Sequence, residues 1–288
     1  MRRLIINADD FGLTHGVNRA IAEAHARGSL TSATLMASAA ATNQAVEQAL
    51  KTPALGVGCH VVLLDGTPIL PAQKIPGLAI PHAGTLHPTL GKFLVQLLTG
   101  RIPGDQIEAE AAAQIALLQS RGLRLTHIDT HKHAHMFPAV LRPVLRAARA
   151  AGIFAIRNPF EPAWASHATR SAPLTRRFQV SLLRRLEPAF RRIVAEEGFR
   201  TTDGAIGVLA TGTLDSATIA SLLHHMPDGT WELVTHPGYN DADLAHARTR
   251  LTASRQIELE ALMSLSARND IELTSFTAPE APTGTSRP

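Results

Sequence analysis

Cysteine is almost absent from this sequence. Cys59 is the only one in 288 residues, which excludes an intrachain disulfide and a zinc site built from cysteines. No apolar run reaches the roughly 18 residues that a membrane-spanning helix needs. The short apolar stretch behind the N-terminal arginines runs directly into acidic residues and therefore does not have the form of a signal peptide. We expect a cytoplasmic protein.

Nucleotide-binding glycine patterns and aromatic residues are also scarce. Neither a G-x-G-x-x-G nor a P-loop pattern occurs, which counts against nucleotide binding. The net charge of +4, with arginines concentrated between residues 170 and 200, could attract nucleic acid, anionic lipid or an acidic substrate. Aromatic residues make up only 4% of the chain, which leaves little surface for base stacking. We therefore expect no nucleic-acid partner.

Apolar, β-rich segments alternate with helical patterns over most of the chain. The predicted strands are Arg3–Ala8, Thr31–Ala37, Leu55–Leu63, Leu125–Asp129, Ile153–Arg157, Ala205–Leu209, Trp231–Thr235 and Ile271–Phe276. The predicted helices are Val17–Arg27, Asp105–Arg121, Pro138–Ala151, Leu174–Glu197, Ser216–His225 and Asp241–Arg268. Such alternation predicts an α/β fold of parallel strands, related to the (β/α)₈ barrel, with an open doubly wound sheet as the alternative.

The barrel is predicted to form a single catalytic domain over residues 1–277, followed by a disordered tail at 278–288. Two of the helices end at a glycine, Gly28 and Gly152, which fits the left-handed position that commonly ends a helix.

Polar residues gather where the predicted strands end. In parallel α/β folds the functional site is built at the carboxyl ends of the strands, so these residues are expected to meet at one rim. In chain order they are Asp9, Asp10, His60, the run His127–His135, Arg157 and His236.

One carboxylate and two imidazoles form a metal site with open positions, suited to a borderline divalent ion such as Zn²⁺ or to Mg²⁺. We predict one such ion, held by Asp10, His60 and His131. Neighbouring side chains of an extended segment point in different directions, so Asp9 could serve as a base while Asp10 binds the ion. His236, from a separate strand, could protonate a leaving group.

Each of these residues also has an ordinary structural interpretation. An Asp-Asp pair at a strand end is often a turn or helix cap, and His60 alone could be a hydrogen-bonded core residue. The run His127–His135 is harder to explain in that way, because several polar side chains on one core face are costly without a purpose. Its period of two aligns the histidines only while the chain stays extended. Cys59 is expected on the opposite face of its strand from His60, as a buried apolar residue.

At these residues the chain resembles the YdjC-like carbohydrate deacetylases, and among them the hopanoid-biosynthesis-associated branch. The similarity extends from Ile5 to about Asp241 and rests on four segments. They read IINADDFGLTHGVNRAI, LGVGCHVVLLDGTPIL, THIDTHKHAHMFP and ELVTHPGYND. The resemblance implies a distorted TIM-like barrel and a hydrolase that removes N-acetyl groups from amino sugars with a bound divalent ion.

By motif position, the resemblance makes Asp10, His60 and His131 the metal ligands, Asp9 the base and His236 the acid. Arg157 and Asp129 are predicted to contact the substrate. The sequence departs from the family where a His-Leu/Phe-x-Leu pattern is expected and His60 is followed by Val-Val-Leu instead. That change keeps the apolar alternation, leaves the metal assignment intact and concerns the packing around the sugar.

The segment Leu174–Ala195 has arginines on one half of its helical wheel and apolar residues on the other. Pro188 is expected to kink or split the helix. An ordinary barrel helix with a solvated arginine face is the favoured interpretation. The alternative is an interfacial helix that rests on anionic lipid at the inner membrane surface, which would suit an N-acetylglucosaminyl hopanoid as substrate.

Two other functions stay open at this stage. A phosphoesterase or amidohydrolase would also use Asp and His on a barrel, although those enzymes typically place an HxH pair on the first strand and often bind more than one metal. The other alternative is a sugar- or lipid-binding protein without turnover. A base beside a metal ligand counts against it, because pure binding does not require a base. The sequence leaves the metal, the sugar and the oligomeric state open, a homodimer included.

Overall fold

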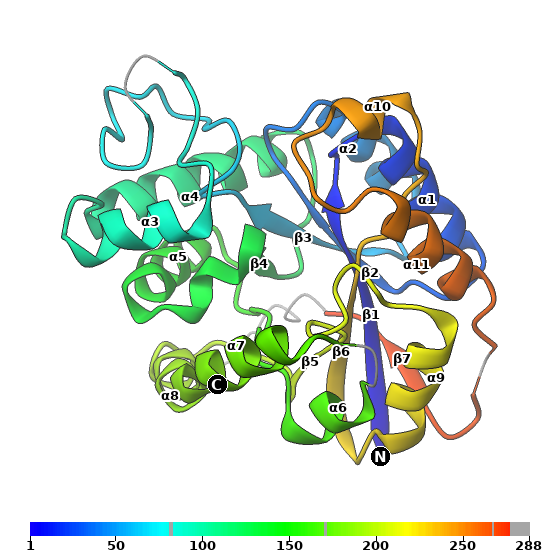
Figure 1. Cartoon of the computed structure of the whole chain (residues 1–288). Helices are drawn as coiled ribbons and strands as arrows, with labels where there is room; N and C mark the ends of the chain where they lie inside the picture. The colour runs from blue at the N-terminus through cyan, green and yellow to red at the C-terminus, as the bar shows by residue number, and fades with distance from the viewer. Residues whose placement is uncertain (81–82, 170–171, 267, 277–288) are drawn as a thin grey trace, which may run out of the picture.

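Seven parallel strands form one curved sheet in the computed structural model, which describes residues 1–80, 83–169, 172–266 and 268–276 (Figure 1). The strand order is β4-β3-β2-β1-β6-β5, and β7 pairs with β1. The strands are β1 Arg2–Phe11, β2 Ser32–Leu35, β3 Gly56–Val61, β4 Ile128–Thr130, β5 Gly204–Ile206, β6 Gly229–Thr235 and β7 Glu272–Thr274. The sheet is an α/β half-barrel, so the predicted distorted TIM-like barrel is confirmed. The predicted tail at 278–288 lies outside the described residues.

The long central strand β1 holds the sheet together. Along one edge it pairs with β6 from Arg2↔Gly229 to Ala8↔Thr235. Along the other edge its first half pairs with β7 and its second half with β2, the latter from Asn7↔Ser32 onward. Neighbouring strands are connected through helices, as right-handed βαβ crossovers require.

Helices cover the outside of the sheet. They are α1 His15–Ala26, α2 Thr42–Lys51, α3 Leu90–Leu98, α4 Gly104–Ser120, α5 Pro138–Ala150, α6 Ala163–Ala168, α7 Leu174–Leu183, α8 Glu187–Glu196, α9 Ser216–His225, α10 Ala242–His246 and α11 Ala253–Met263, with 3₁₀ turns η1 His131–Met136 and η2 Arg184–Leu186. The helix ends predicted at Gly28 and Gly152 are confirmed, because both glycines have left-handed φ angles, +83° and +76°.

Three predicted elements differ from the sequence expectation. The single helix predicted at Asp241–Arg268 is two helices, α10 and α11. The segment Ile153–Arg157 is no regular strand; it makes single parallel bridges from Ile156 to Ile128 and from Ala155 to Arg200. It thereby connects β4 with the segment that precedes β5. The predicted helix Leu174–Glu197 is divided into α7 and α8 by η2, and Pro188 lies in the first turn of α8, where a missing N–H is tolerated.

The rings of His127 and Phe276 form an aromatic floor that packs against β3. The His127 ring stacks on Phe276, with centroids 3.9 Å apart and planes 15° from parallel. The same ring fills the space beside Gly58, where an added Cβ would lie 2.6 Å from His127 Cε1. Burial lowers the pKa of His127 to about 3, so this imidazole is a neutral packing group.

We expect Gly58→Ala to lower the free energy of unfolding by about 1–3 kcal/mol, because the methyl group would overpack the His127 ring. Urea unfolding followed by circular dichroism measures the change. Gly91→Ala in α3 is the control, since nothing lies within 4 Å of its added Cβ, and a change within about 1 kcal/mol, in the stabilising direction, is expected there. Equal stabilities of the Gly58→Ala variant and the wild type would contradict this account of the floor.

Candidate metal centre and catalytic site

Three predicted metal ligands meet at the carboxyl ends of β1, β3 and β4. The His60 Nε2 and His131 Nδ1 atoms are 3.2 Å apart. Asp10 Oδ1 lies 3.6 Å from the former and 3.4 Å from the latter. Three ligand atoms at such distances from one another could hold a metal ion.

The surroundings of these three residues fit a divalent ion. Asp10 Oδ1 is buried and has no hydrogen-bond partner among the described residues, which is costly unless a cation faces it. His60 Nδ1 hydrogen-bonds to Asp129 Oδ1 at 2.8 Å, so its Nε2 is left for an ion. A carboxylate behind a histidine is the usual way in which proteins orient a metal-binding imidazole.

A second cluster of buried groups, Asp9, His60 and Asp129, is also compact enough for an ion. Its carboxylates are already neutralised by protein, since Arg157 Nη1 and Nη2 donate to Asp9 Oδ2 and Oδ1 at 2.8 and 2.6 Å. Arg157 also forms an ion pair with Asp129. The first cluster is therefore the better candidate for the metal centre.

Arg157 lies at the centre of the buried polar interior. It is fully buried and also donates from Nε to Glu232 Oε1 at 2.7 Å. Asp129 is fully buried as well. Buried positions of this kind do not favour the predicted contact of Arg157 and Asp129 with the substrate, and we propose instead that they orient Asp9 and His60.

These contacts set the charges of the site. Burial by itself would raise the pKa of Asp9, but the Arg157 guanidinium and His60 hold it well below its usual value. Burial would likewise lower the pKa of His60, which the adjacent Asp129 carboxylate raises to about 9. The base predicted from the sequence is thus a carboxylate that stays ionised at neutral pH.

His236 follows β6 and lies beside this cluster. Its Nε2 is 3.9 Å from Asp9 Oδ2, and its Nδ1 is 3.7 Å from Glu258 Oε2 on α11. Its backbone N–H donates to the same Glu258 oxygen at 2.6 Å. Burial alone would lower the pKa of His236, but Glu258 raises it above the usual value, so the charged imidazolium is favoured.

The histidine-rich run does not continue as one extended strand. Strand β4 stops at Thr130, and Lys132 and His133 take left-handed φ angles of 56° and 54° within η1. Only His131 of the histidines after the strand joins the metal centre. His135 hydrogen-bonds to Thr130 Oγ1 at 2.8 Å and to the Arg157 carbonyl oxygen at 3.2 Å, which is a structural role.

Three residues that contact the candidate site were not predicted: Glu232, Arg255 and Glu258. Glu232 lies within the predicted strand Trp231–Thr235, where an acidic residue among apolar ones was the available signal. Arg255 and Glu258 belong to a helix whose charged residues resemble any solvated face, so no pattern in one sequence distinguishes them.

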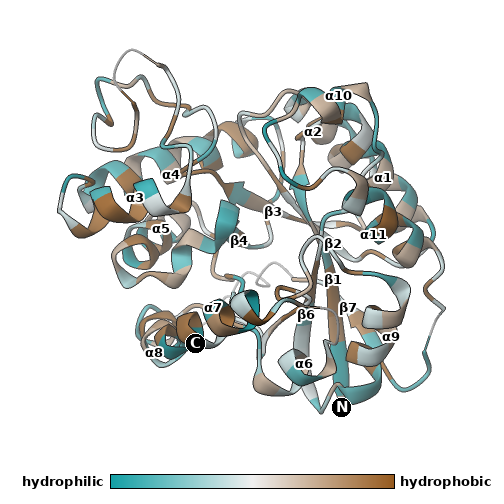
Figure 2. Cartoon of the chain, viewed as in Figure 1, coloured by the Kyte–Doolittle hydropathy of each residue, from teal (hydrophilic) through white to brown (hydrophobic). Residues whose placement is uncertain are grey.

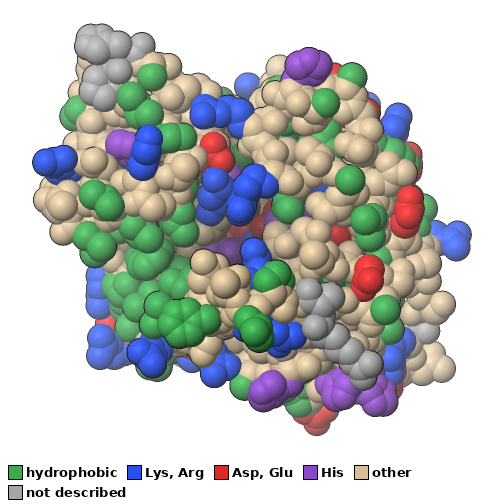
Figure 3. Space-filling model, viewed as in Figure 1, with side chains coloured by type: hydrophobic (Ala, Val, Ile, Leu, Met, Phe, Trp, Pro, Cys, Tyr) green, Lys and Arg blue, Asp and Glu red, His purple; other side chains and the backbone are tan. Residues whose placement is uncertain are grey.

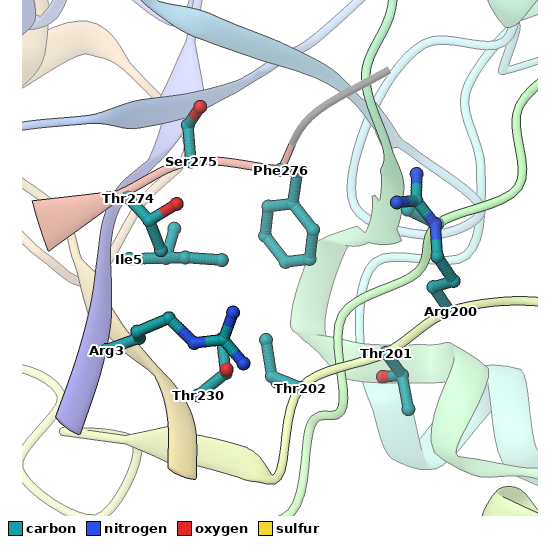
Figure 4. A pocket seen from close by; sticks show the side chains of 10 residues that line it. Arg3, Ile5, Arg200, Thr201, Thr202, Thr230, Thr274, Ser275 and Phe276 are labelled. Atoms are coloured by element: carbon teal, nitrogen blue, oxygen red, sulfur yellow. The ribbon is translucent and has the colours of Figure 1, made fainter. Parts of the chain in front are cut away.

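The candidate centre and a cavity lined by Arg3 and Ile5 lie at opposite ends of β1. Figure 3 shows acidic and histidine side chains in a hollow between the part of the molecule with α3, α4 and α5 and the part with α1, α2 and α10. A separate cavity of about 270 Å³ opens at the amino end of β1, where Arg3, Ile5, Thr230 and Phe276 line it (Figure 4). It is remote from Asp10 along the strand and takes no part in the site described above.

A curved parallel sheet with an Asp-His-His cluster at its carboxyl edge defines an α/β barrel protein that could hold a metal ion. Residues 3–273 match the YdjC-like protein family, and the chain belongs to it. The predicted family is therefore confirmed, whereas its hopanoid-associated branch stays a prediction.

Relatives and a solved structure agree with this assignment. The chain is 32% identical to a carbohydrate deacetylase of Brevibacillus brevis over 95% of this chain and 98% of that protein. It is 40% identical to a chitooligosaccharide deacetylase of Salmonella typhi over 53% and 58% of the two chains. A crystal structure from Enterococcus faecalis V583, of a protein to which cellobiose-phosphate cleavage is attributed, aligns with a TM-score of 0.73 at 27% identity. That alignment covers 96% of this chain and 97% of the other.

We expect calorimetric titration of chelator-treated protein to detect one divalent ion per chain. His131→Ala should weaken its binding by about 100-fold or more, exceeding the 10- to 100-fold typical for loss of a group behind a ligand. His133→Ala is the matched control, because His133 lies in the same turn but outside the donor set, and it should bind the ion like the wild type. Two ions per chain, or wild-type affinity in His131→Ala, would contradict the assignment.

Proposed function

We propose that this chain is a carbohydrate deacetylase that hydrolyses the N-acetyl group of an amino sugar, with release of acetate and a free amine. The observation that carries the proposal is the juxtaposition of an Asp10-His60-His131 cluster with an ionised carboxylate, Asp9, and an imidazole, His236. Amide hydrolysis needs all three functions: an electrophile, a base and an acid. The carbohydrate and chitooligosaccharide deacetylases among the relatives support an N-acetylated oligosaccharide as the substrate class.

The base is Asp9. Arg157 engages both of its oxygens, and Asn7 Nδ2 and Thr34 Oγ1 donate to Oδ1 at 2.9 and 3.2 Å. Asp9 Oδ2 thereby keeps the freer lone pair, on the side that faces His236. An attacking water hydrogen-bonded to Oδ2 would pass its proton to this oxygen.

A divalent ion, bound by Asp10, His60 and His131, would polarise the acetyl carbonyl and make water more acidic. The protein's own part is to fix the direction of the ligands. Asp129 sets the orientation of the His60 ring, and the turn at η1 fixes His131. Oriented groups of this kind need no rearrangement as negative charge develops on the substrate.

His236 is the acid. The Glu258 carboxylate favours its protonated form, so it has a proton to give to the departing sugar nitrogen. Its Nε2 and Asp9 Oδ2 are 3.9 Å apart, so the two groups border one space in which a scissile C–N bond could lie. Base and acid would then act on the same bond from adjacent positions.

We expect Asp9→Asn and His236→Gln each to lower kcat for acetate release from N-acetylchitooligosaccharides by about 10²- to 10⁴-fold, the usual contribution of a general base or acid. An enzymatic acetate assay with added Mg²⁺ or Zn²⁺ measures it. His225→Gln, exposed at the end of α9, is the control and should keep wild-type activity. No acetate from any sugar, with release of phosphate from phosphoesters instead, would overturn the proposal.

The outer surface of α7 supports a narrower substrate, an N-acetylated sugar carried by a membrane lipid such as a hopanoid. Leu174, Phe178 and Leu182 are 83%, 70% and 48% exposed, and their spacing of four residues aligns them on one side of the helix. Figures 2 and 3 show apolar residues along α7 and a broad apolar area on this side of the molecule. No helix among the described residues is long and apolar enough to cross a membrane.

Charge favours an anionic lipid surface as the occupant of this stripe. Arg184 and Arg185 follow it directly and form no ion pair with a described residue. Arg176 is held by the Val208 and Leu209 carbonyl oxygens, so only part of the predicted arginine face is available to lipid. Contact would place α7 on the headgroups of the membrane's inner surface, without insertion of the barrel.

We expect the wild type to co-sediment with vesicles containing anionic lipid, and high salt to weaken the binding. The triple variant Leu174→Gln, Phe178→Gln, Leu182→Gln should bind at least about tenfold more weakly, because each fully buried apolar side chain contributes about 1.5–3 kcal/mol. The variant Leu50→Gln, Ile257→Gln, which alters two apolar residues exposed elsewhere, is the control. A homodimer that only the triple variant loses would show that a second copy covers the stripe instead.

A further inference from the structure

Helix α11 carries two fully buried charged residues, Arg255 and Glu258, which are 0% and 1% exposed. They are three positions apart and therefore share one face of the helix. They do not pair with each other. Each contacts a different residue of the candidate site, so both sides of that site meet a single rigid element.

Arg255 holds one oxygen of the predicted metal ligand Asp10. Its Nη2 donates to Asp10 Oδ2 at 2.5 Å, and its Nε donates to the Leu251 carbonyl oxygen at 3.1 Å. Asp10 Oδ2 is thereby engaged, whereas Oδ1 faces His60 and His131 without a partner. The guanidinium thus decides which oxygen of Asp10 is presented to an ion.

Glu258 holds His236 in a similar manner. Its Oε2 accepts the His236 backbone N–H at 2.6 Å and lies 3.7 Å from Nδ1 of the ring. The loop is fixed a second time two residues later, because the Gly238 N–H donates to the Arg255 carbonyl oxygen at 3.1 Å. A side chain at Gly238 would approach Arg255 Cδ to 3.1 Å, so only glycine allows this close contact without displacement.

We propose that Arg255 and Glu258 are positioning residues of the reaction, with Arg255 selecting the Asp10 oxygen that binds the ion and Glu258 directing the Nε2 atom of His236 toward the scissile bond. The proposal rests on the proposed function for the reaction and on the geometry of α11 for the residues. Removal of either charge would leave a site residue buried without its partner.

Stability alone accounts poorly for this arrangement. Burying a charged group costs several kcal/mol of desolvation, and well-packed apolar residues are often equally stable in its place. Here the two charged side chains contact Asp10 and His236, residues that the proposed mechanism uses. Glu258 Oε1 and Arg255 Nη1 are buried without a hydrogen-bond partner among the described residues, which a purely structural pair would avoid.

The groups that face His236 come from two elements. Glu258 belongs to α11, and Asp9 and Asp10 belong to β1. Of these, Glu258 is the closest carboxylate to Nδ1, whereas Asp9 lies on the Nε2 side. Replacing Glu258 by glutamine therefore removes the charge behind the ring and leaves the site carboxylates in place.

For Arg255, the experiment is calorimetric binding of Zn²⁺ to chelator-treated Arg255→Lys and Arg255→Met. Both variants should bind the ion about 10- to 100-fold more weakly, the usual effect of a group behind a ligand. Lysine keeps the charge but not the forked geometry, so weaker binding by Arg255→Lys would assign the effect to orientation. Arg248→Lys, at an exposed position nearby, is the control. Wild-type affinity in both Arg255 variants would overturn the proposal for Arg255.

For Glu258, the experiment is the titration of His236 by NMR in wild type and Glu258→Gln, with the signal assigned by its loss in His236→Gln. The pKa of His236 should fall by about 1 to 3 pH units, since a carboxylate at this range shifts a neighbour by that much. The alkaline limb of kcat/KM for acetate release should move down with it, and Zn²⁺ affinity should not change. Glu260→Gln, exposed on the same helix, is the control. An unmoved His236 titration would overturn the proposal for Glu258.

Failure of the proposed deacetylase function and failure of the two positioning roles can be told apart. The calorimetric and NMR measurements need no turnover, so they test the geometry of α11 even if no sugar releases acetate. Acetate release with unchanged Zn²⁺ affinity and His236 titration in the variants would keep the deacetylase and remove the positioning roles.

Discussion

The contact on which the rest of the site depends is the buried guanidinium of Arg157 among Asp9, Asp129 and Glu232. Carboxylates brought this close inside a barrel would repel one another and take up protons. Arg157 keeps Asp9 and Asp129 ionised, whereas burial raises the pKa of Glu232 to about 7. One buried cation thus stabilises the ionised carboxylates of the candidate site.

The consequences of this contact reach the metal centre through a short chain of bonds. Asp129 pairs with Arg157 and also accepts from His60 Nδ1, so the same carboxylate that balances the guanidinium orients a predicted ligand. Asp9 pairs with Arg157 and lies beside His236. The proposed base, metal ligand and acid are therefore held in one network, and loss of Arg157 would disturb all of them together. Such networks are worth more than their separate bonds.

Much of this could be predicted from the sequence. The parallel α/β architecture followed from alternating apolar segments, and the residues at the strand ends were found because such folds collect polar groups there. Gly28 and Gly152 end their helices with left-handed φ angles, as predicted. These features depend on local patterns, which one sequence contains in full.

The parts that could not be predicted depend on contacts between distant segments. Ile153–Arg157 has the composition of a strand, yet it forms only single bridges, one to the short strand β4 and one to Arg200 ahead of β5. The period of the histidine run suggested one aligned face, but the backbone turns at Lys132 into left-handed geometry. Arg255 and Glu258 lack any local signal, since their proposed role depends on the site against which α11 packs.

The Asp9-Asp10 pair illustrates how a local irregularity creates chemistry. In a regular strand, adjacent side chains alternate between the two faces, which would direct one aspartate into the barrel and the other toward the helices. The register of β1 with β2 shifts between Ala8 and Phe11, and Asp10 has a left-handed φ of 63°. Aspartate tolerates this conformation better than most residues, although holding it costs about 1–3 kcal/mol.

Bulges of this kind redirect a side chain beside functional sites. Here Asp9 pairs with Arg157, whereas Asp10 turns toward Arg255, His60 and His131. Two chemically identical neighbours thereby acquire different partners and different tasks. The ion pair with Arg255 holds the redirected Asp10 carboxylate in this orientation. In the proposed positioning role, this is why a buried arginine from a distant helix meets the first strand at this point.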